Sequence, residues 1–302
     1  MKETILNYED FKKQLFDNIS RLISENDNIE SSSMNNFFKE GRGYLDAISI
    51  KFKNSNLAPC VYVADLYSHY EESEIGVNKL AEEVINFLNH DKPKFNINIE
   101  KLLKTPDINE HLYLKLINPD NFNSEEPCTT MNFLNLIAVP RCTVDINGER
   151  GSILINKNIQ ESLLNLSDDE LIDIAYNNSR KVNYNVKSMH DILSISGLED
   201  IDDINIFDNE MYILSNTSCV AGAVAIMFPE VLKDIRNTTF NGNNFFIIPS
   251  SIHEVILLKD NGIMNVDEMR KMCHDVNINE LEKCDILSYD IYYYDGETIT
   301  IK

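Results

Sequence analysis

The stretch that most constrains the fold runs over residues 244–259, where two short apolar runs flank a polar centre. The apolar runs, residues 245–248 and 255–258, are too short for ordinary globular helices and are rich in Phe, Ile and Val. The centre, residues 249–254, reads Pro-Ser-Ser-Ile-His-Glu. The pattern therefore predicts two buried strands joined by a polar corner, which is either a structural turn or a site.

The last third of the chain has the same strand-rich character. Further strands are predicted at residues 211–215, 222–228, 286–294 and 298–301. One helix is predicted to begin at Pro229 and another after a cap at Asn265. The resulting order, β-β-α-β-β-α-β-β, predicts an α+β fold with helices packed on one face of an antiparallel or mixed sheet.

The N-terminal part alternates helix and strand signals. Apolar residues recur at helical spacing over residues 11–23 and 77–88, and strands are predicted at 48–53, 60–64 and 112–118. Residues 31–33, Ser-Ser-Ser, are interpreted as a mobile connection. The polar stretch 119–130 is the best internal boundary, which predicts lobes at 1–125 and 126–302 or one continuous domain.

Two local signatures lie in the middle of the chain. Asn147-Gly148 favours the positive φ angles of a tight turn, so residues 144–146 and 152–155 are predicted to form a hairpin. Ser167, followed three residues later by Glu170 and then by apolar residues, is typical of a capping box that opens a helix.

Charge excludes several classes of partner. With 27 Lys and Arg against 49 Asp and Glu, the net charge is −22. Because nucleic-acid binding depends on cations that neutralise phosphates, direct binding to DNA or RNA is not expected, and neither is binding to an anionic membrane. A basic protein partner is favoured instead. A second hypothesis is that the acidic surface imitates nucleic acid and blocks a basic protein.

Residues 191–210 are the most acidic segment, with seven acids and no base. Asp200, Asp202 and Asp203 are the residues there that we predict to take part in an interaction. The segment lacks the glycine and the terminal glutamate of an EF-hand loop, so a calcium site is not predicted.

The six cysteines show no paired spacing, which predicts reduced thiols. The first residues lack the basic and apolar regions of a signal peptide, and no apolar run is long enough to cross a bilayer. We therefore expect a cytoplasmic protein.

The corner at 249–254 holds the residue types of a hydrolase, with Ser250, Ser251, His253 and Glu254. On an extended segment Ser251 and His253 share one face and Glu254 points to the other, so an orienting acid would have to come from elsewhere. The competing interpretation is that the serines hydrogen-bond a turn after Pro249. His253-Glu254 is followed by Leu257 where a zinc protease needs its second histidine, so no metal and no cofactor are predicted.

Three consecutive tyrosines close the last predicted strand. Because side chains alternate along a strand, Tyr292 and Tyr294 are exposed if Tyr293 is buried, or the reverse. Exposed neighbouring tyrosines suit a protein interface, so Tyr292 and Tyr294, with Ser250 and Glu254, are the other interaction residues that we predict.

Several short segments of the sequence resemble those of a known family. Tyr62-Val63-Ala64-Asp65-Leu66-Tyr67, residues 211–216, the run from Phe246 to Leu257, and Tyr292-Tyr293-Tyr294-Asp295 are similar to the domain-of-unknown-function family 5688, whose members are common in clostridial bacteria and their mobile elements. The resemblance covers most of the chain. It implies one unit of bacterial origin and no assigned reaction.

Together these observations favour a cytoplasmic interaction or regulatory protein without catalysis, of the kind carried on mobile elements. The alternatives are a hydrolase-like enzyme that uses Ser251 and His253, and an acidic mimic of nucleic acid.

Overall fold

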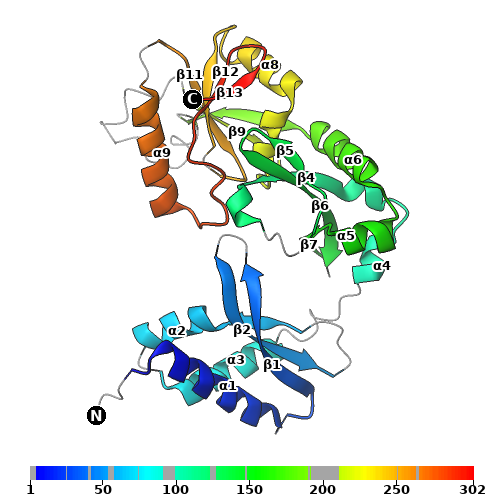
Figure 1. The fold of residues 1–302 in the computed structure, drawn as a ribbon, viewed down its shortest axis with the longest axis vertical. Helices are drawn as coiled ribbons and strands as arrows, with labels where there is room; N and C mark the ends of the chain where they lie inside the picture. The colour runs from blue at the N-terminus through cyan, green and yellow to red at the C-terminus, as the bar shows by residue number, and fades with distance from the viewer. Residues whose placement is uncertain are drawn as a thin grey trace. The chain divides into compact units, whose positions relative to one another are not determined.

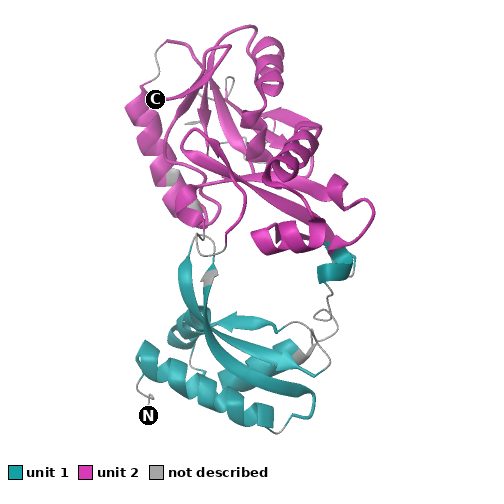
Figure 2. Cartoon of the chain, turned by 45° about the vertical axis from the view of Figure 1, so that its right-hand side comes forward, with its two compact units in different colours: residues 1–102, 145–150 teal, residues 103–144, 151–302 magenta. Residues whose placement is uncertain are grey.

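The computed structural model describes the chain in the following ranges: 5–24, 26–39, 42–53, 58–73, 75–90, 99–122, 127–146, 148–189, 191, 211–249, 251–262 and 265–302. The chain divides into two compact units (Figure 2). Unit 1 comprises Met1–Leu102 with Asp145–Arg150, and unit 2 comprises Leu103–Val144 with Gly151–Lys302. The predicted lobes at 1–125 and 126–302 stay a prediction.

Among its described residues, unit 1 contains a three-stranded antiparallel sheet, in the order β1-β2-β3, with the helices α1, α2 and α3. In chain order its elements are α1 (Tyr8–Ser24), β1 (Ile29–Lys39), β2 (Gly43–Phe52), β3 (Cys60–Tyr62), α2 (Val63–Glu72) and α3 (Val77–His90). The interpretation of Ser31–Ser33 as a mobile connection is wrong, because these serines lie in β1 and pair with Lys51, Ile50 and Ser49 of β2. The long partner strand outweighs the modest strand preference of serine.

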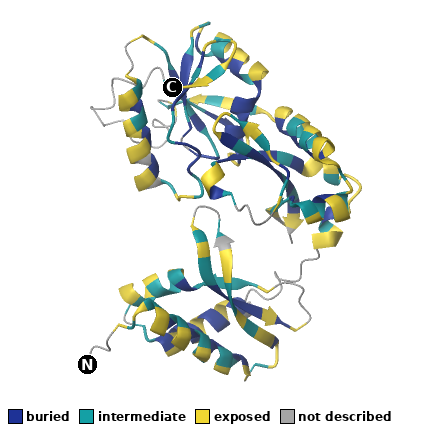
Figure 3. Ribbon diagram, viewed as in Figure 1, coloured by how far each residue is buried: buried dark blue, intermediate teal, exposed yellow. Residues whose placement is uncertain are grey.

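The core of unit 1 forms where α1 and α3 pack against β2. Its buried residues come from the predicted apolar faces of both helices and from alternate positions of the strand (Figure 3). They include Phe11, Leu15 and Ile19 of α1, Ile48, Ile50 and Phe52 of β2, and Leu80, Val84 and Ile85 of α3.

The next part of the chain forms a smaller antiparallel sheet, in the order β4-β6-β5 with β7 paired to β6. Its elements are α4 (Ile99–Leu103), η2 (Ile108–His111), β4 (Leu112–Ile117), η3 (Pro119–Asn121), β5 (Met131–Phe133), β6 (Leu136–Ile146), β7 (Glu149–Leu154), α5 (Lys157–Ile159), η4 (Gln160–Leu164, a π-helical turn) and α6 (Asp168–Arg180). The hairpin at Gly148 and the capping box of Ser167 and Glu170 are both confirmed.

The last third of the chain forms a six-stranded antiparallel sheet, in the order β13-β12-β10-β11-β9-β8. Its elements are β8 (Tyr184–Ser188), β9 (Met211–Asn216), η5 (Gly222–Met227), α8 (Pro229–Thr238), β10 (Phe245–Ile248), β11 (Val255–Lys259), α9 (Val266–Glu280), β12 (Tyr292–Tyr294) and β13 (Ile299–Ile301). In the described residues the three sheets are open and antiparallel, which confirms the α+β class.

Two strand predictions in this region differ from the structure. Within the predicted strand 222–228, residues Gly222–Met227 form the buried 3₁₀ helix η5, so this segment is not a strand. A short apolar run is compatible with a strand or with a helix. The left-handed conformation of Ala221 turns the chain at the start of this run, which favours the helix. The strand predicted over 286–294 is restricted to β12, because the buried polar residue Ser288 bonds Asn135 and the Asp290 N–H before the strand begins.

Helices cover both faces of the six-stranded sheet, whereas one covered face was expected (Figure 1). On one face α9 contributes Met269 and Cys273 to a cluster with Phe246. On the other, Phe240 follows α8 and stacks on Phe245 at 4.8 Å between ring centroids. Since Phe245 and Phe246 are neighbours in β10, the alternation of one strand supplies both packed layers.

No helix within the described ranges is both long enough and apolar enough to cross a lipid bilayer.

Candidate functional site at the β10–β11 corner

The corner of residues 249–254 connects β10 and β11, which pair antiparallel with Ile248 opposite Ile256. The predicted strands on either side are therefore confirmed. The corner lies against the end of β9 and the start of η5, because Ala223 donates its N–H to the Ile252 carbonyl at 3.3 Å. It also lies against the segment before β12, because Ile252 donates to the Asp285 carbonyl at 2.9 Å.

Ser251 uses its side chain to hold the corner. Its Oγ accepts the N–H of His253 at 3.1 Å and the N–H of Glu254 at 3.2 Å. Its own N–H donates to the Glu254 carbonyl at 3.2 Å. The residue is 7% exposed. A serine that bonds the backbone two and three residues ahead is a turn-forming residue.

His253 accepts one hydrogen bond at its ring and has a carboxylate close to the other ring nitrogen. Nδ1 accepts the N–H of Ala221 at 3.3 Å, and Nε2 lies 3.8 Å from Oδ1 of Asp285. The side chain is 39% exposed. Asp285 is the acid that the strand alternation required from elsewhere in the chain. Its sequence context carries no signal for this role, and it lies 32 residues from His253 in the chain.

The loop from Asn216 to Ala221 contacts His253 through the Ala221 N–H. The Asn216 side chain accepts the N–H of Val220 at 3.2 Å and donates to its carbonyl at 2.7 Å. Cys219 and Ala221 both have φ near +53°, a left-handed conformation that is uncommon for residues other than glycine. Such conformations persist only where the surroundings fix them.

Gly222 is required by close packing at this point. A Cβ atom there would lie 2.4 Å from Ser215 Oγ, 2.5 Å from the His253 carbonyl oxygen and 2.7 Å from the Asn216 nitrogen. The same carbonyl oxygen accepts the Ser215 hydroxyl at 2.8 Å. The corner, β9 and η5 thus meet at a point where only a hydrogen atom fits. Sequence reasoning missed Ser215 and Ala221, although the Ala221-Gly222 pair is a visible signal for a sharp turn.

The chemistry of this arrangement follows from its hydrogen bonds. A serine nucleophile needs its hydroxyl aligned with a base. The Ser251 hydroxyl instead faces two backbone amides, and His253 faces Ala221 and Asp285. The structure brings His253 and Asp285 close together here. The imidazole of His253 accepts the Ala221 N–H and so helps to position the loop before η5.

The other predicted interaction residues have different placements. Glu254 is half-buried. Tyr292 and Tyr294 are 0% and 2% exposed, so neither offers a surface to a partner, and the half-exposed tyrosine is Tyr293. The Tyr292 hydroxyl donates to Asn135 Oδ1 at 2.6 Å, and burial raises its pKa to about 12. Ser250, Asp200, Asp202 and Asp203 lie outside the described residues.

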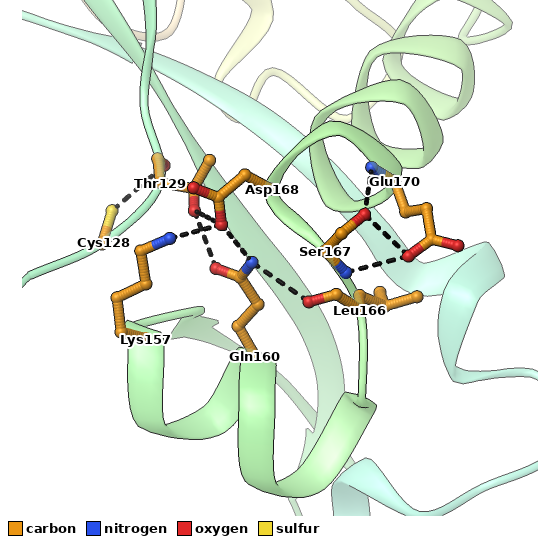
Figure 4. A network of polar contacts seen from close by, with 8 residues as sticks. All are labelled: Cys128, Thr129, Lys157, Gln160, Leu166, Ser167, Asp168 and Glu170. Carbon is orange, nitrogen blue, oxygen red and sulfur yellow. Dashed lines mark hydrogen bonds and ion pairs between the residues drawn. The ribbon is translucent and has the colours of Figure 1, made fainter.

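A second polar cluster joins the start of α6 to the π-helical turn η4 (Figure 4). Gln160, which is 1% exposed, accepts the Thr129 hydroxyl at 2.7 Å and donates to Asp168 Oδ1 at 2.7 Å. The Lys157 ammonium also binds Asp168, and these contacts lower the Asp168 pKa to about 2. Among the described residues, no buried side-chain nitrogen or oxygen of this cluster lacks a hydrogen-bond partner, which is typical of a structural network.

Cysteine chemistry is not activated near this cluster. Burial raises the pKa of Cys128 to about 11, so the thiol is protonated at neutral pH. In the ranges that the structure describes, no group of three His, Cys, Asp or Glu side chains lies close enough to hold a metal ion.

With the geometry established, comparison with known proteins places the chain. Residues 8–296 match a family described as "Family of unknown function (DUF5688)". The chain belongs to this family. The DUF5688 match includes residues of both compact units and confirms the predicted membership of this family. No curated protein and no solved structure matches the chain.

Proposed function

We propose that this DUF5688 protein is a non-catalytic interaction or regulatory protein that binds a basic protein partner. One observation carries the first half of the proposal. The hydroxyl of Ser251 accepts two backbone N–H groups of its own turn, at 3.1 and 3.2 Å, and so serves as part of the scaffold. His253, the candidate base, holds the Ala221 N–H instead of a nucleophile.

Charge supports the nature of the partner. Acids exceed bases by 22, so even if every Lys and Arg paired with one acid, many carboxylates would remain for a partner. Such an excess steers cationic surfaces toward the protein and repels nucleic acid.

The six cysteines are all unpaired, including the exposed Cys219, which fits a reducing compartment. The free thiols support our proposal of a cytoplasmic location.

Affinity capture with identification by mass spectrometry tests the proposal. The full chain is used as bait in an extract of its native host, alongside Ser251→Ala and His253→Gln variants. We expect a partner with a basic surface, captured equally by all three baits that remain folded. An acidic or neutral partner would refute the proposed chemistry. A reaction that wild type catalyses and a folded Ser251→Ala protein does not would refute the non-catalytic role.

A further inference from the structure

The loop between β9 and η5, residues 216–221, is joined to the corner of residues 249–254 through an imidazole. Ala221 donates its N–H to Nδ1 of His253 at 3.3 Å. On one side of the loop, Ser215 donates its hydroxyl to the His253 carbonyl at 2.8 Å. On the other side, Ala223 donates its N–H to the Ile252 carbonyl at 3.3 Å. The flanks of the loop therefore bond to carbonyl oxygens that do not titrate, whereas the loop itself bonds to a ring that does.

The backbone of this loop needs support to keep its conformation. Cys219 and Ala221 both have a φ of 53°, which lies in the left-handed region, and neither is a glycine. Such a backbone persists only where its surroundings fix it. Burial contributes little over residues 217–220, which are all exposed. The support comes from the hydrogen bonds of Asn216 to Val220 and of Ala221 to His253.

The hydrogen bond from Ala221 determines the protonation state of the ring. Because a backbone N–H can only donate, Nδ1 of His253 presents its lone pair, and the ring is neutral with its proton on Nε2. When an imidazole takes up a second proton, both of its nitrogens become donors. The Nδ1–H group would then face the N–H of Ala221, and this hydrogen bond would be lost. The side chain of His253 is 39% exposed, so solvent can deliver the proton.

A carboxylate lies on the other side of the ring. Oδ1 of Asp285, in the segment before β12, lies 3.8 Å from Nε2, which is within ion-pair distance but too long for a hydrogen bond. The helix η5 carries no titratable side chain. The other titratable groups on the segments that pack against His253 are Glu254 of the corner, Cys219 of the loop, and Glu282, Lys283 and Cys284 next to Asp285. A charged imidazolium is therefore attracted toward Asp285 and away from the Ala221 N–H.

We propose that His253 is a pH-sensitive switch that controls the loop of residues 216–221. In its neutral form it binds the Ala221 N–H and holds the loop against the corner. In its protonated form it releases Ala221 and pairs with Asp285. Because the contacts of β9 and η5 with the corner do not titrate, the change is confined to the loop and alters the surface that Cys219 and Val220 expose. Histidine side chains titrate between about pH 5 and pH 8, so the switch operates near physiological pH.

The test is an NMR titration of the ¹⁵N-labelled full chain from pH 8 to pH 5. The signals of the ring nitrogens report the tautomer, and we expect an unprotonated Nδ1 on His253 at pH 8. As the ring takes up its proton, the amide signals of Cys219, Val220 and Ala221 should shift. The protection of the Ala221 N–H against hydrogen exchange should fall about five-fold, the equivalent of one ordinary hydrogen bond. The protection of the Ala223 N–H should stay constant.

His253→Asn separates the switch from other effects of pH, because its side-chain oxygen can replace Nδ1 as an acceptor but does not titrate. We expect the Ala221 N–H of this variant to be equally protected at pH 8 and pH 5. His274→Asn is the matched control, since it removes an exposed histidine on α9 and should leave the transition unchanged.

A loss of Ala221 protection that persists in His253→Asn would overturn the switch. Two results on the wild-type chain would overturn it without any variant. One is a proton on Nδ1 of His253 at pH 8, and the other is an Ala221 protection that does not change as the ring titrates.

Discussion

At the scale of single residues, Ser251 illustrates how a candidate nucleophile becomes part of a scaffold. Its hydroxyl oxygen accepts two backbone N–H groups of its own turn, at 3.1 and 3.2 Å. His253 is similarly committed to the Ala221 N–H. The corner at residues 249–254 therefore joins β9, β10, β11 and η5.

Replacing Ser251 by alanine should lower the free energy of unfolding by about 1–2 kcal/mol, because two partly buried N–H groups lose their acceptor. Urea denaturation followed by circular dichroism measures this in a chain that has no Trp. Ser162→Ala is the matched control, since that hydroxyl is exposed and makes one local bond to Asn158. The turn role would be wrong if both variants were as stable as wild type.

Gly222→Ala should be far more damaging, because the new methyl group would lie 2.4–2.7 Å from three atoms. We expect a loss of at least about 3 kcal/mol or a failure to fold, as for severe overpacking. Gly242→Ala separates steric from conformational cost, since Gly242 has a φ of +83° but open space around its Cβ position. That variant should lose about 1–2 kcal/mol. Similar losses in both variants would contradict the close packing.

At the scale of elements, polar residues fix the ends of helices in unit 2. The capping box of Ser167 and Glu170 begins α6, and Asp168 joins that start to Lys157 and Gln160. The chain thereby ties α5, η4 and α6 into one block.

The Asp168 link makes an acid-dependent contribution to stability. Its folded pKa of about 2 lies below the ordinary value of 3.8, because of bonds from Lys157, Gln160 and Thr129. A lowered folded pKa means that the stabilisation is present above about pH 4 and is lost as the pH falls toward 2. Asp168→Asn should therefore be less stable than wild type at neutral pH, by an amount that shrinks in acid.

Urea midpoints measured from pH 7 down to pH 3 test this link. Asp169→Asn is the control, because it removes a neighbouring exposed carboxylate that is outside the cluster. If the two variants showed the same pH dependence, Asp168 would not be the linking residue.

Prediction from sequence succeeded where the signal was local. The β10 and β11 strands, the capping box and the hairpin at Gly148 all follow from residues within a few positions of one another. The turn role of Ser251 is equally local, and a structural turn was one of the two alternatives predicted for this corner, the other being a hydrolase site. Failures arose where distant contacts decide. The sequence around Ala221 carries no signal that His253 will accept its N–H. Residues 222–227 are a short apolar run that is buried in the fold, and such a run is compatible with a strand or with the 3₁₀ helix that it forms.

At the scale of the whole molecule, the reactivity of the thiols should report on burial across unit 2, where Cys142, Cys219 and Cys273 all lie. Cys142 and Cys273 are buried, and burial raises the pKa of each to about 11. Cys219 is the exposed cysteine.

Iodoacetamide at pH 7.5 should therefore modify Cys219 first and leave Cys142 and Cys273 unmodified in the folded protein. Peptide mapping by mass spectrometry gives the order, and labelling in urea is the control in which all six cysteines react. Early modification of Cys273 would contradict the packing of α9 on the six-stranded sheet.

Charge is the property of the whole molecule that bears most directly on function. A surplus of 22 acids favours association with a cationic surface and makes that association sensitive to salt.

The most direct test of this account is the dissociation constant of the captured partner, measured by calorimetry at 50 and 500 mM NaCl. We expect binding to weaken roughly ten-fold or more at high salt, with Ser251→Ala matching wild type at both concentrations. An affinity independent of salt would contradict the electrostatic basis of the interaction. A loss of binding in a folded Ser251→Ala protein would place function at the β10–β11 corner instead.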